Sequence, residues 1–383
     1  MTRILFTSNP GLGHIHPMVP LAAALAGRGH EVRWAVAPDV CSRLEAAGFA
    51  TFPAGMGGPE RAAEFERRFA ETRTLPPEKR PDHMFPAFFG ESCSPVMLRD
   101  LLPVVDHWRP AVIVRDAAEF AAPLAAALTG VPHVTHAFGA LVPEHRVAAA
   151  SAAVAPLWEA HGLDPRRYGG SYDHLYLDIY PPSMRFGSYE HVPQVQPLRP
   201  VPFDAVEGEH AEPAGGGGRP LVYLTFGTVF NDASQFSAAI AGVARHDVDV
   251  LVTVGPRGDP ARLGSVPPNV QVERYVPQTS VLSRCAAVAS HAGSGTFLAS
   301  LGVGVPQLCL PQAADQFINA GQGAKAGAAL KLVPAEASVD AIADAVGRLL
   351  HERAFTDAAR RIGDEIAGMP SPDDVAAILE DLW

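Results

Sequence analysis

Residues 286–296 read AAVASHAGSGT, and this stretch decides the fold class because it joins a small apolar strand to a helix through a glycine-rich turn. Gly293 and Gly295 let backbone N–H groups approach an anion, and the dipole of the following helix adds partial positive charge. Ser294 and Thr296 add hydroxyl donors, and His291 adds a further donor and a potential charge. No lysine follows, so the turn is not a P-loop. The pattern favours a small diphosphate, although close strand–helix packing is the commoner reason for any one glycine turn.

The same alternation of apolar strands and helical stretches runs through the whole chain. The first half contains candidate strands at Ile4–Ser8, Glu31–Val36, Ala111–Arg115, His133–Ala137 and Leu175–Tyr180. The second half contains candidates at Leu221–Phe226, Val248–Val254, Ala286–Ser290 and Pro306–Leu310. Strands that are apolar along most of their length and separated by helices predict parallel sheets covered on both faces. We therefore expect an α/β protein with two Rossmann-like domains facing across a cleft.

The two series of strands are separated by a stretch that cannot build a core. Four consecutive glycines, Gly215–Gly218, are typical of a flexible linker. We expect a first domain over 1–204, a linker over 205–219 and a second domain over 220–368. Ser371 is a good N-cap for a final helix over 369–383, which we expect to cross back to the first domain. For residues 205–219, the alternative to a linker between domains is a long surface loop inside one domain.

Composition narrows the classes of partner. Apolar residues make up 48% of the 383 residues, enough for sizeable cores, and the formal net charge of −11 argues against nucleic acid. No apolar run reaches the length of a membrane span, and no signal-peptide core follows Arg3. The four cysteines are far apart and show no paired spacing. We expect a cytoplasmic protein with reduced thiols. The oligomeric state is left open, a homodimer included.

A histidine lies in the turn that follows the first strand. Residues 11–17 read GLGHIHP, which lacks the third glycine of a dinucleotide-binding turn. Open parallel sheets bind ligands beyond the carboxyl ends of their strands, so we expect His14 to face the ligand site. It is either a general base or a polar turn residue without chemistry. A metal site at His14 and His16 lacks a third ligand.

A carboxylate ends another strand of the same predicted sheet. The run VIVRD places Asp116 at the edge where His14 is expected. Asp116 is positioned to orient the imidazole and to stabilise its protonated form. Glu119, one turn later, is the competing candidate, and an N-cap role for Asp116 is the structural alternative.

Two further turns of the second half are expected at the edge that carries His291. Thr228, in the run FGT, follows the first strand and suits a phosphate contact. Asp315 and Gln316 follow a later strand. One of these side chains only accepts hydrogen bonds and the other both donates and accepts, so together they suit vicinal sugar hydroxyls.

These motifs together resemble the nucleotide-sugar-dependent glycosyltransferases of the GT-B fold, most closely the bacterial enzymes that decorate antibiotics and other natural products. The run HAGSGT at 291–296, the pair DQ at 315–316 and the pair GH at 13–14 carry the resemblance, which covers essentially the whole chain. It implies that the first domain binds the acceptor and that the second binds the nucleotide sugar.

The resemblance also implies a role for each matching residue. His14 would deprotonate the acceptor hydroxyl, and Asp116 would orient it. The diphosphate would be held by His291, Gly293, Ser294, Gly295, Thr296 and Thr228. The other residues that would bind the nucleotide sugar are Val276 and Gln278 beside the nucleobase and ribose, Asp315 and Gln316 on the sugar, and Asn319 near the phosphates.

One departure from the family bears on the donor. Plant relatives carry a tryptophan that stacks on uracil where this chain has Val276. The absence of this ring leaves a dTDP-sugar or a UDP-sugar as the co-substrate. Because the bacterial members of the family generally use dTDP-deoxysugars, the resemblance favours the former, and no other cofactor is expected. The acceptor is expected to be a small aglycone bound by Phe85, Phe88, Phe89 and Phe138. The alternative is that these phenylalanines only pack in the core between helices.

The expected reaction is a single inverting displacement without a metal. The one D-x-D triplet, Asp247–Asp249, leads into a strand and so lies at the wrong edge for a phosphate site. Two rivals stay open: a nucleotide-sugar epimerase of similar architecture, and a catalytically silent relative that acts only as a partner protein.

Overall fold

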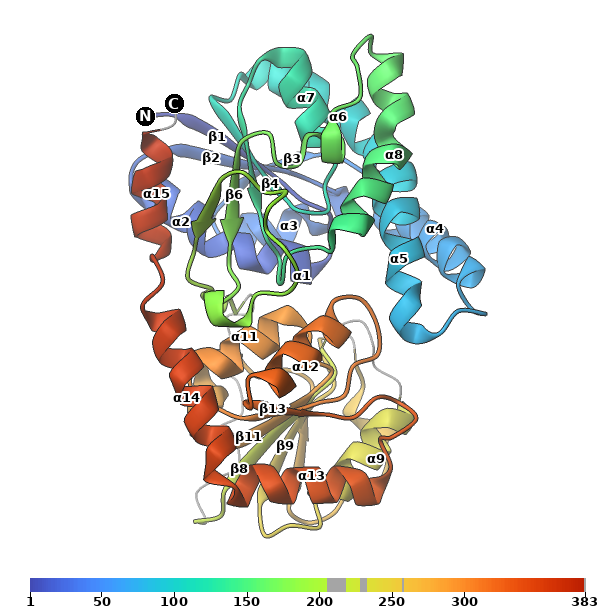
Figure 1. Ribbon diagram of the computed structural model, residues 1–383, viewed down its shortest axis with the longest axis vertical. Helices are drawn as coiled ribbons and strands as arrows, with labels where there is room; N and C mark the ends of the chain where they lie inside the picture. The colour runs from blue at the N-terminus through green and yellow to red at the C-terminus, as the bar shows by residue number, and fades with distance from the viewer. Residues whose placement is uncertain (205–217, 228–232, 257, 382–383) are drawn as a thin grey trace. The chain divides into compact units, whose positions relative to one another are not determined.

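The computed structural model describes residues 1–204, 218–227, 233–256 and 258–381. Contacts divide the chain into two units, each built around one parallel sheet (Figure 1). The first unit comprises Met1–Tyr180, Gly187–Arg199 and Pro370–Trp383, and the second comprises Pro181–Phe186 and Pro200–Met369. Most of the expected linker, residues 205–217, lies outside the described residues.

The sheet of the first unit has seven strands in the order β3-β2-β1-β4-β5-β6-β7. Their bounds are β1 (Arg3–Thr7), β2 (Glu31–Val36), β3 (Ala50–Pro53), β4 (Val112–Asp116), β5 (His133–His136), β6 (Leu175–Asp178) and β7 (Val195–Pro197). The strand order runs outward in both directions from β1 and β4. The carboxyl ends of these two strands therefore form a topological switch point, where open α/β sheets bind ligands.

The sheet of the second unit has six strands in the order β10-β9-β8-β11-β12-β13. Their bounds are β8 (Leu221–Thr225), β9 (Asp249–Thr253), β10 (Val270–Glu273), β11 (Cys285–Ser290), β12 (Gln307–Cys309) and β13 (Ala329–Lys331). Its switch point lies between β8 and β11, because the order reverses there. The prediction of two parallel α/β sheets is confirmed.

The strands that the sequence did not reveal are the four edge strands, β3, β7, β10 and β13. Each is short, and most of its residues are partly exposed. Edge strands need no continuous apolar run because only one neighbour pairs with them. The nine expected strands are all present, with ends that differ from the prediction by at most two residues.

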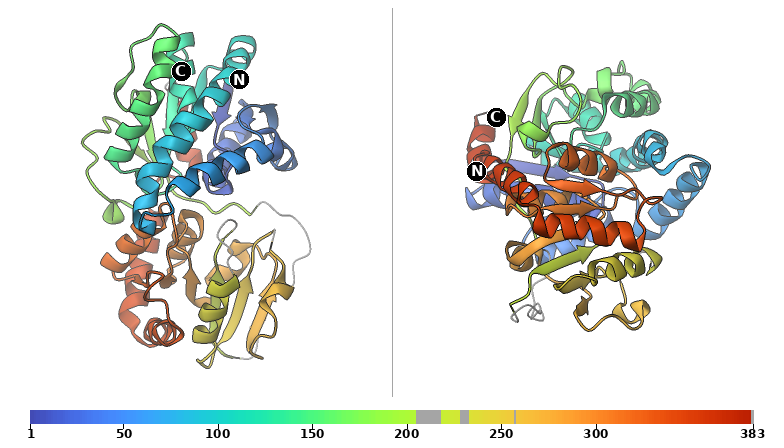
Figure 2. Two further views of the ribbon diagram at one scale, coloured as in Figure 1. Left: turned by 90° about the vertical axis from the view of Figure 1, so that its right-hand side faces the viewer. Right: turned by 60° about the horizontal axis from the view of Figure 1, so that its bottom comes forward.

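Helices flank both sheets (Figures 1 and 2). Those of the first unit are α1 (Leu12–Ile15), α2 (Val19–Gly27), α3 (Pro38–Ala46), α4 (Gly58–Glu71), α5 (Arg80–Met84), α6 (Ser94–Trp108), α7 (Ala121–Thr129), α8 (Glu144–Ala160) and α15 (Pro372–Glu380). Those of the second are α9 (Ala233–Val243), α10 (Gln278–Val281), α11 (Ser294–Gly302), α12 (Gln316–Lys325), α13 (Val339–His351) and α14 (Arg353–Ala367). A π-helix, η3 (Phe85–Cys93), joins α5 to α6. None of the described helices is long and apolar enough to cross a membrane.

Alternating residues of one central strand show how the second core forms. Val222 and Leu224 of β8 pack in the apolar cluster that holds α9 and α13. Leu221 and Tyr223 face the other way, into a cluster with Val281 of α10. This two-sided burial explains why the strand is apolar throughout.

The C-terminal helix α15 belongs to the first unit and contacts α2. Ser371 caps it as predicted, accepting a hydrogen bond from the Asp374 backbone N–H at 3.2 Å. Near its other end, Arg28 donates two hydrogen bonds to Glu380, at 3.0 and 2.6 Å. The cap stabilises the first turn of the helix itself, and the Arg28 contact attaches its last turn to the first unit.

Candidate active site

His14 lies beyond the carboxyl end of β1, one of the two strands at the switch point of the first sheet. Gly11 is the N-cap residue of α1, and His14 is the third residue of that helix. A β-carbon at Gly11 would lie 2.9 Å from Cδ2 of His14, so glycine is needed for the ring to pack here. The turn therefore has a structural purpose besides any phosphate contact.

Asp116, the last residue of β4, holds the imidazole. The His14 Nδ1 lies 3.1 Å from Asp116 Oδ1, and the carboxylate is completely buried. A carboxylate only accepts hydrogen bonds, so Nδ1 carries the proton and Nε2 is left as the acceptor. Asp116 also accepts hydrogen bonds from the backbone N–H groups of Ala118, at 2.7 Å, and Asn9, at 2.6 Å. Asp116 thus holds the imidazole and also stabilises the turn after β4, but it is not the N-cap of α7, which begins at Ala121 with Phe120 as its N-cap residue.

Glu119, the competing carboxylate, is used elsewhere. It accepts hydrogen bonds from the Thr7 hydroxyl, at 2.8 Å, and from the Ala121 backbone N–H, at 2.6 Å. The helix after β4, α7, begins at Ala121, and Glu119 stabilises its first turn by accepting hydrogen bonds from the backbone N–H groups there. Burial raises the pKa of Glu119.

Arg115 is a part of this site that the sequence analysis missed. It is fully buried and donates hydrogen bonds to Thr135 Oγ1, at 3.0 Å, and to the carbonyl oxygens of Asp116, at 3.2 Å, and Glu119. Burial lowers its pKa, and the charges of Glu119 and Asp116 oppose that effect. A charged residue inside the apolar run VIVRD was the available signal, since buried arginines need partners. Its contacts fix the turn that presents Asp116.

Two of the four phenylalanines predicted to bind the acceptor contact His14. The ring centroid of Phe138 lies 4.6 Å from that of His14, and the centroid of Phe89 lies 5.3 Å away. Phe85 and Phe88 are buried and pack against Phe89, with centroids at 5.4 and 5.3 Å. Phe89 is presented by the π-helix η3, a rare element that is frequent at functional sites.

In the second unit, the turn after β11 leads directly into α11. Gly293 is the N-cap residue, and among the residues that the structure describes no side chain caps this helix. Ala292 adopts a positive φ of 62°, and its carbonyl oxygen accepts a hydrogen bond from Asn319 at 2.9 Å. The first backbone N–H groups of α11 are therefore available to an anion.

The ring of His291 fills the space between two glycines. A β-carbon at Gly227 would lie 2.6 Å from its Cε1, and a β-carbon at Gly293 would lie 2.5 Å from its Nε2. Burial lowers the pKa of His291 to about 4. This burial favours the uncharged ring at neutral pH, so His291 offers a hydrogen-bonding group rather than the positive charge that the sequence left open.

Gly295 differs from Gly293. Apart from the backbone of its own helix, no atom of the described residues lies within 4 Å of the position that its β-carbon would occupy, and its φ is not in the positive range that favours glycine. Neither packing nor backbone conformation requires a glycine here. A glycine at this position leaves open space beside the first turn of α11.

Asp315, Gln316 and Asn319 are fixed by hydrogen bonds around this turn. Asp315 Oδ2 accepts hydrogen bonds from Ser294 Oγ, at 2.5 Å, and from Asn319 Nδ2, at 3.2 Å. Gln316 Oε1 accepts hydrogen bonds from the backbone N–H groups of Gln312 and Ala313, at 2.7 and 2.9 Å. The network joins the start of α12 to the start of α11, so both helix termini are positioned together.

Three further residues were predicted to bind the nucleotide sugar: Val276, Gln278 and Thr228. Val276 is 2% exposed and packs in an apolar cluster with Tyr223. Gln278 Nε2 donates a hydrogen bond to Thr296 Oγ1 at 2.8 Å, which ties α10 to α11. Thr228 lies outside the described residues.

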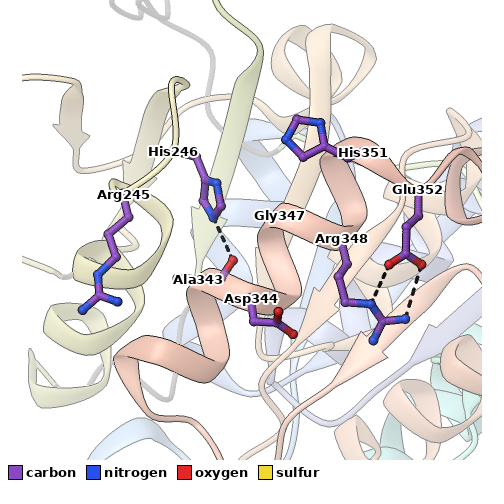
Figure 3. Close-up of a pocket in the computed structure, with 8 residues that line it drawn as sticks. All are labelled: Arg245, His246, Ala343, Asp344, Gly347, Arg348, His351 and Glu352. Atoms are coloured by element: carbon purple, nitrogen blue, oxygen red, sulfur yellow. Dashed lines mark hydrogen bonds and ion pairs between the residues drawn. The ribbon is translucent and has the colours of Figure 1, made fainter.

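The opposite edge of the second sheet carries a different feature. A hollow of about 500 Å³ is lined by Arg245, His246, Ala343, Asp344, Gly347, Arg348, His351 and Glu352 (Figure 3). His246 precedes β9, so this hollow lies at the amino-terminal edge of the strands, away from the turn at His291. Asp249, of the D-x-D triplet, pairs with Arg219 at that same edge. Among the described residues, no three His, Cys, Asp or Glu side chains are grouped to hold a metal.

Comparison with known proteins places the chain in a family. The chain matches the N-terminal domain of the erythromycin biosynthesis protein CIII-like family over residues 23–206 and its C-terminal domain over residues 237–382. Elloramycin glycosyltransferase ElmGT of Streptomyces olivaceus is 34% identical over 98% of this chain and 96% of its own length. The chain belongs to the glycosyltransferases of antibiotic biosynthesis.

Other relatives of this glycosyltransferase agree in function and in fold. The aclacinomycin-T 2-deoxy-L-fucose transferase of Streptomyces galilaeus is 30% identical over 99% of this chain and 96% of its own length. The spinosyn rhamnosyltransferase SpnG is 28% identical, with a TM-score of 0.84 and complete coverage of both chains. SpnG has also been solved with thymidine diphosphate and with spinosyn aglycone. The glycosyltransferase therefore has the two-domain GT-B fold, and its family uses nucleotide sugars.

Proposed function

We propose that this glycosyltransferase moves a deoxysugar from a dTDP-sugar to a hydroxyl of a small apolar aglycone, in one inverting displacement with His14 as the general base. Relatives that transfer a deoxysugar or were solved with thymidine diphosphate favour this donor over a UDP-sugar. The contact between His14 and Asp116 is the observation that carries the proposal.

The acceptor half of the reaction rests on the tautomer of His14. Because Nδ1 donates to Asp116, the lone pair of Nε2 is available to take the proton of the acceptor hydroxyl. The hydroxyl oxygen then bonds to the anomeric carbon as the bond from that carbon to the diphosphate breaks. The imidazolium that results lies beside a buried carboxylate, which stabilises its charge. Phe89 and Phe138 border the imidazole with apolar surface.

The donor half rests on the first turn of α11. Negative charge develops on the departing diphosphate, and uncapped backbone N–H groups stabilise it without rearranging. The open space at Gly295 supports close approach of a phosphate. Asp315 Oδ1 and the Gln316 amide nitrogen make no hydrogen bond to other described residues. They are assigned to sugar hydroxyls.

The proposal includes catalysis without a metal ion. Backbone dipoles and the Thr296 hydroxyl, which accepts a hydrogen bond from Gln278 and can still donate one, supply the stabilisation that a divalent cation supplies in other transferases. Turnover should be unchanged after dialysis against EDTA. Restoration of a lost activity by Mg²⁺ or Mn²⁺ would contradict this part.

The decisive experiment replaces His14 by alanine. We expect kcat to fall about 10²- to 10⁴-fold, the usual contribution of a general base. Calorimetry should show an unchanged Kd for dTDP, because the residues proposed to bind the nucleotide all belong to the second unit, whereas His14 belongs to the first. His161→Ala, at an exposed histidine that bonds only its own helix, is the matched control. Unchanged turnover in His14→Ala would refute the role. Titrating UDP beside dTDP tests the donor class, and a free nucleotide product without a glycosylated acceptor would favour an epimerase.

A further inference from the structure

The imidazole of His14 is enclosed on several sides by groups that offer it no hydrogen bond. Phe138 and Phe89 both lie against it with tilted rings, at interplanar angles of 51° and 60°. The backbone at Gly11 borders its Cδ2 edge. With Asp116 on Nδ1, only 18% of the His14 side chain is exposed.

The two phenylalanines come from different elements that are independently anchored. Phe138 follows β5 by two residues, and the last residue of β5, His136, is the pairing partner of Asp116 in β4. The strand pairing that presents the carboxylate therefore presents Phe138 at the same edge. Phe89 lies in the middle of η3. Gly90, the next residue, would place a β-carbon 3.0 Å from that of Ala153, so η3 is held tightly against α8.

This enclosure has two consequences for a base. A half-turn of the imidazole about its bond to the β-carbon would place Cδ2 opposite Asp116 in the position of Nδ1. The two phenylalanine rings obstruct that rotation. When the imidazole takes a proton, its positive charge lies within about 6 Å of two aromatic rings, the range of cation–π attraction. Neither effect requires the acceptor to touch the phenylalanines.

We infer that Phe138 and Phe89 are positioning residues that clamp the His14 imidazole and stabilise its protonated form. The inference rests on the proposed general-base role of His14. It goes beyond the acceptor contacts expected of these phenylalanines, because it assigns them an effect on the base itself. The titratable groups on the elements around His14 include Arg115, Asp116 and Glu119 on and after β4, His133 and His136 of β5, Glu91 and Cys93 of η3, and His16 beside α1. A phenylalanine-to-leucine change alters none of these residues.

The test uses Phe138→Leu and Phe89→Leu, which keep apolar volume but remove the ring. We expect each to lower kcat roughly tenfold or more through misorientation of the base. The acid limb of the pH profile of kcat should move to lower pH by about half a unit, because the protonated base loses its aromatic neighbour. Phe49→Leu removes a buried ring whose contact is with Trp34 instead, and its profile should match the wild type.

A double-mutant cycle separates the clamp from acceptor binding. In the His14→Ala background, Phe138→Leu should change kcat less than twofold if Phe138 acts through His14. An equal loss of kcat in both backgrounds, or an acid limb that stays in place in both leucine variants, would overturn the inference. Failure of the general-base role itself gives a different result, since His14→Ala alone would then leave kcat unchanged. NMR titration of the His14 ring in the free protein measures the effect of the phenylalanines on its protonation whether or not His14 is the base. A titration midpoint that is the same in Phe138→Leu and in the wild type would contradict the inference.

Discussion

His14 Nδ1 and Asp116 Oδ1 are 3.1 Å apart although their residues are separated by 102 positions in the chain. The contact forms because β1 and β4 are neighbours at the switch point of the first sheet. Each residue follows or ends one of these strands, so parallel pairing brings both to one edge. Five predictions follow from this and related contacts.

Replacing Asp116 by asparagine should lower kcat by about 10²-fold or more, because an amide cannot hold the Nδ1–H tautomer and balance an imidazolium charge. It should also lower the free energy of unfolding by about 1–3 kcal/mol, since one amide oxygen replaces two carboxylate oxygens that accept backbone N–H groups. Steady-state kinetics and chemical denaturation measure the two effects. A kcat within threefold of wild type would show that the carboxylate only stabilises the turn.

Replacing the buried Arg115 by methionine should destabilise the first unit by about 2–5 kcal/mol. The carbonyl oxygens of Asp116 and Glu119 would each lose the hydrogen bond from Arg115, and the charges of two carboxylates would lose a nearby cation. Because the turn that carries Asp116 would relax, kcat should fall as well. Denaturation in urea together with kinetics at a temperature well below unfolding checks both. Full stability would show that Arg115 is a passive core residue.

Two glycines of the same turn should respond differently to alanine. Gly293→Ala places a β-carbon 2.5 Å from His291 Nε2, so the melting temperature should fall. Gly295→Ala meets no neighbouring atom and lies inside a helix, where alanine is favoured over glycine by up to about 1 kcal/mol. It should therefore keep or raise stability while weakening dTDP binding, which calorimetry measures. Unchanged affinity in Gly295→Ala would place the phosphate elsewhere.

Acid should destabilise the protein through buried neutral histidines. Burial lowers the pKa of His291 and of His136 from 6.5 to about 4. Between these values the unfolded chain binds more protons than the folded one, so stability falls as pH drops from about 6.5 towards 4. Each histidine contributes up to about 3 kcal/mol to this loss. The free energy of unfolding measured across that range should vary less with pH in His136→Gln than in the wild type. An identical slope would show that His136 takes up its proton without unfolding.

The C-terminal helix should loosen when its carboxylate is neutralised. Arg28 and His30 hold the pKa of Glu380 at about 2, through hydrogen bonds of 2.6–3.0 Å. Glu380→Gln should increase amide hydrogen exchange over residues 372–380. Glu352→Gln, which breaks an ion pair with Arg348 inside the second unit, is the control and should leave that segment unchanged. Equal exchange in both variants would mean that apolar packing alone holds the helix.

Much of the fold was predictable from local patterns. Strands buried on both faces are apolar throughout, so nine of them were visible in the sequence, whereas β3, β7, β10 and β13 were not. The cap at Ser371 was visible because N-caps depend on a few adjacent residues. The turn sequences around His14 and His291 likewise identified the edges that carry the site.

The finer features of the site depended on contacts between distant segments. The sequence left Asp116 and Glu119 as rivals, and only the hydrogen bonds of Thr7 and Ala121 to Glu119 separated them. The charge on His291 could not be judged either, because the burial that removes it comes from backbone at Gly227, 64 positions earlier.

By itself, the sequence determined that the chain forms two parallel sheets with glycine-rich turns at their carboxyl edges, because burial periodicity and turn chemistry are local properties. Only the tertiary structure decided which carboxylate holds His14, why Arg115 is buried beside it, and which phenylalanines enclose it. Those outcomes depend on strand order and on the packing of η3 beside the sheet, and neither is encoded in the spacing of neighbouring residues.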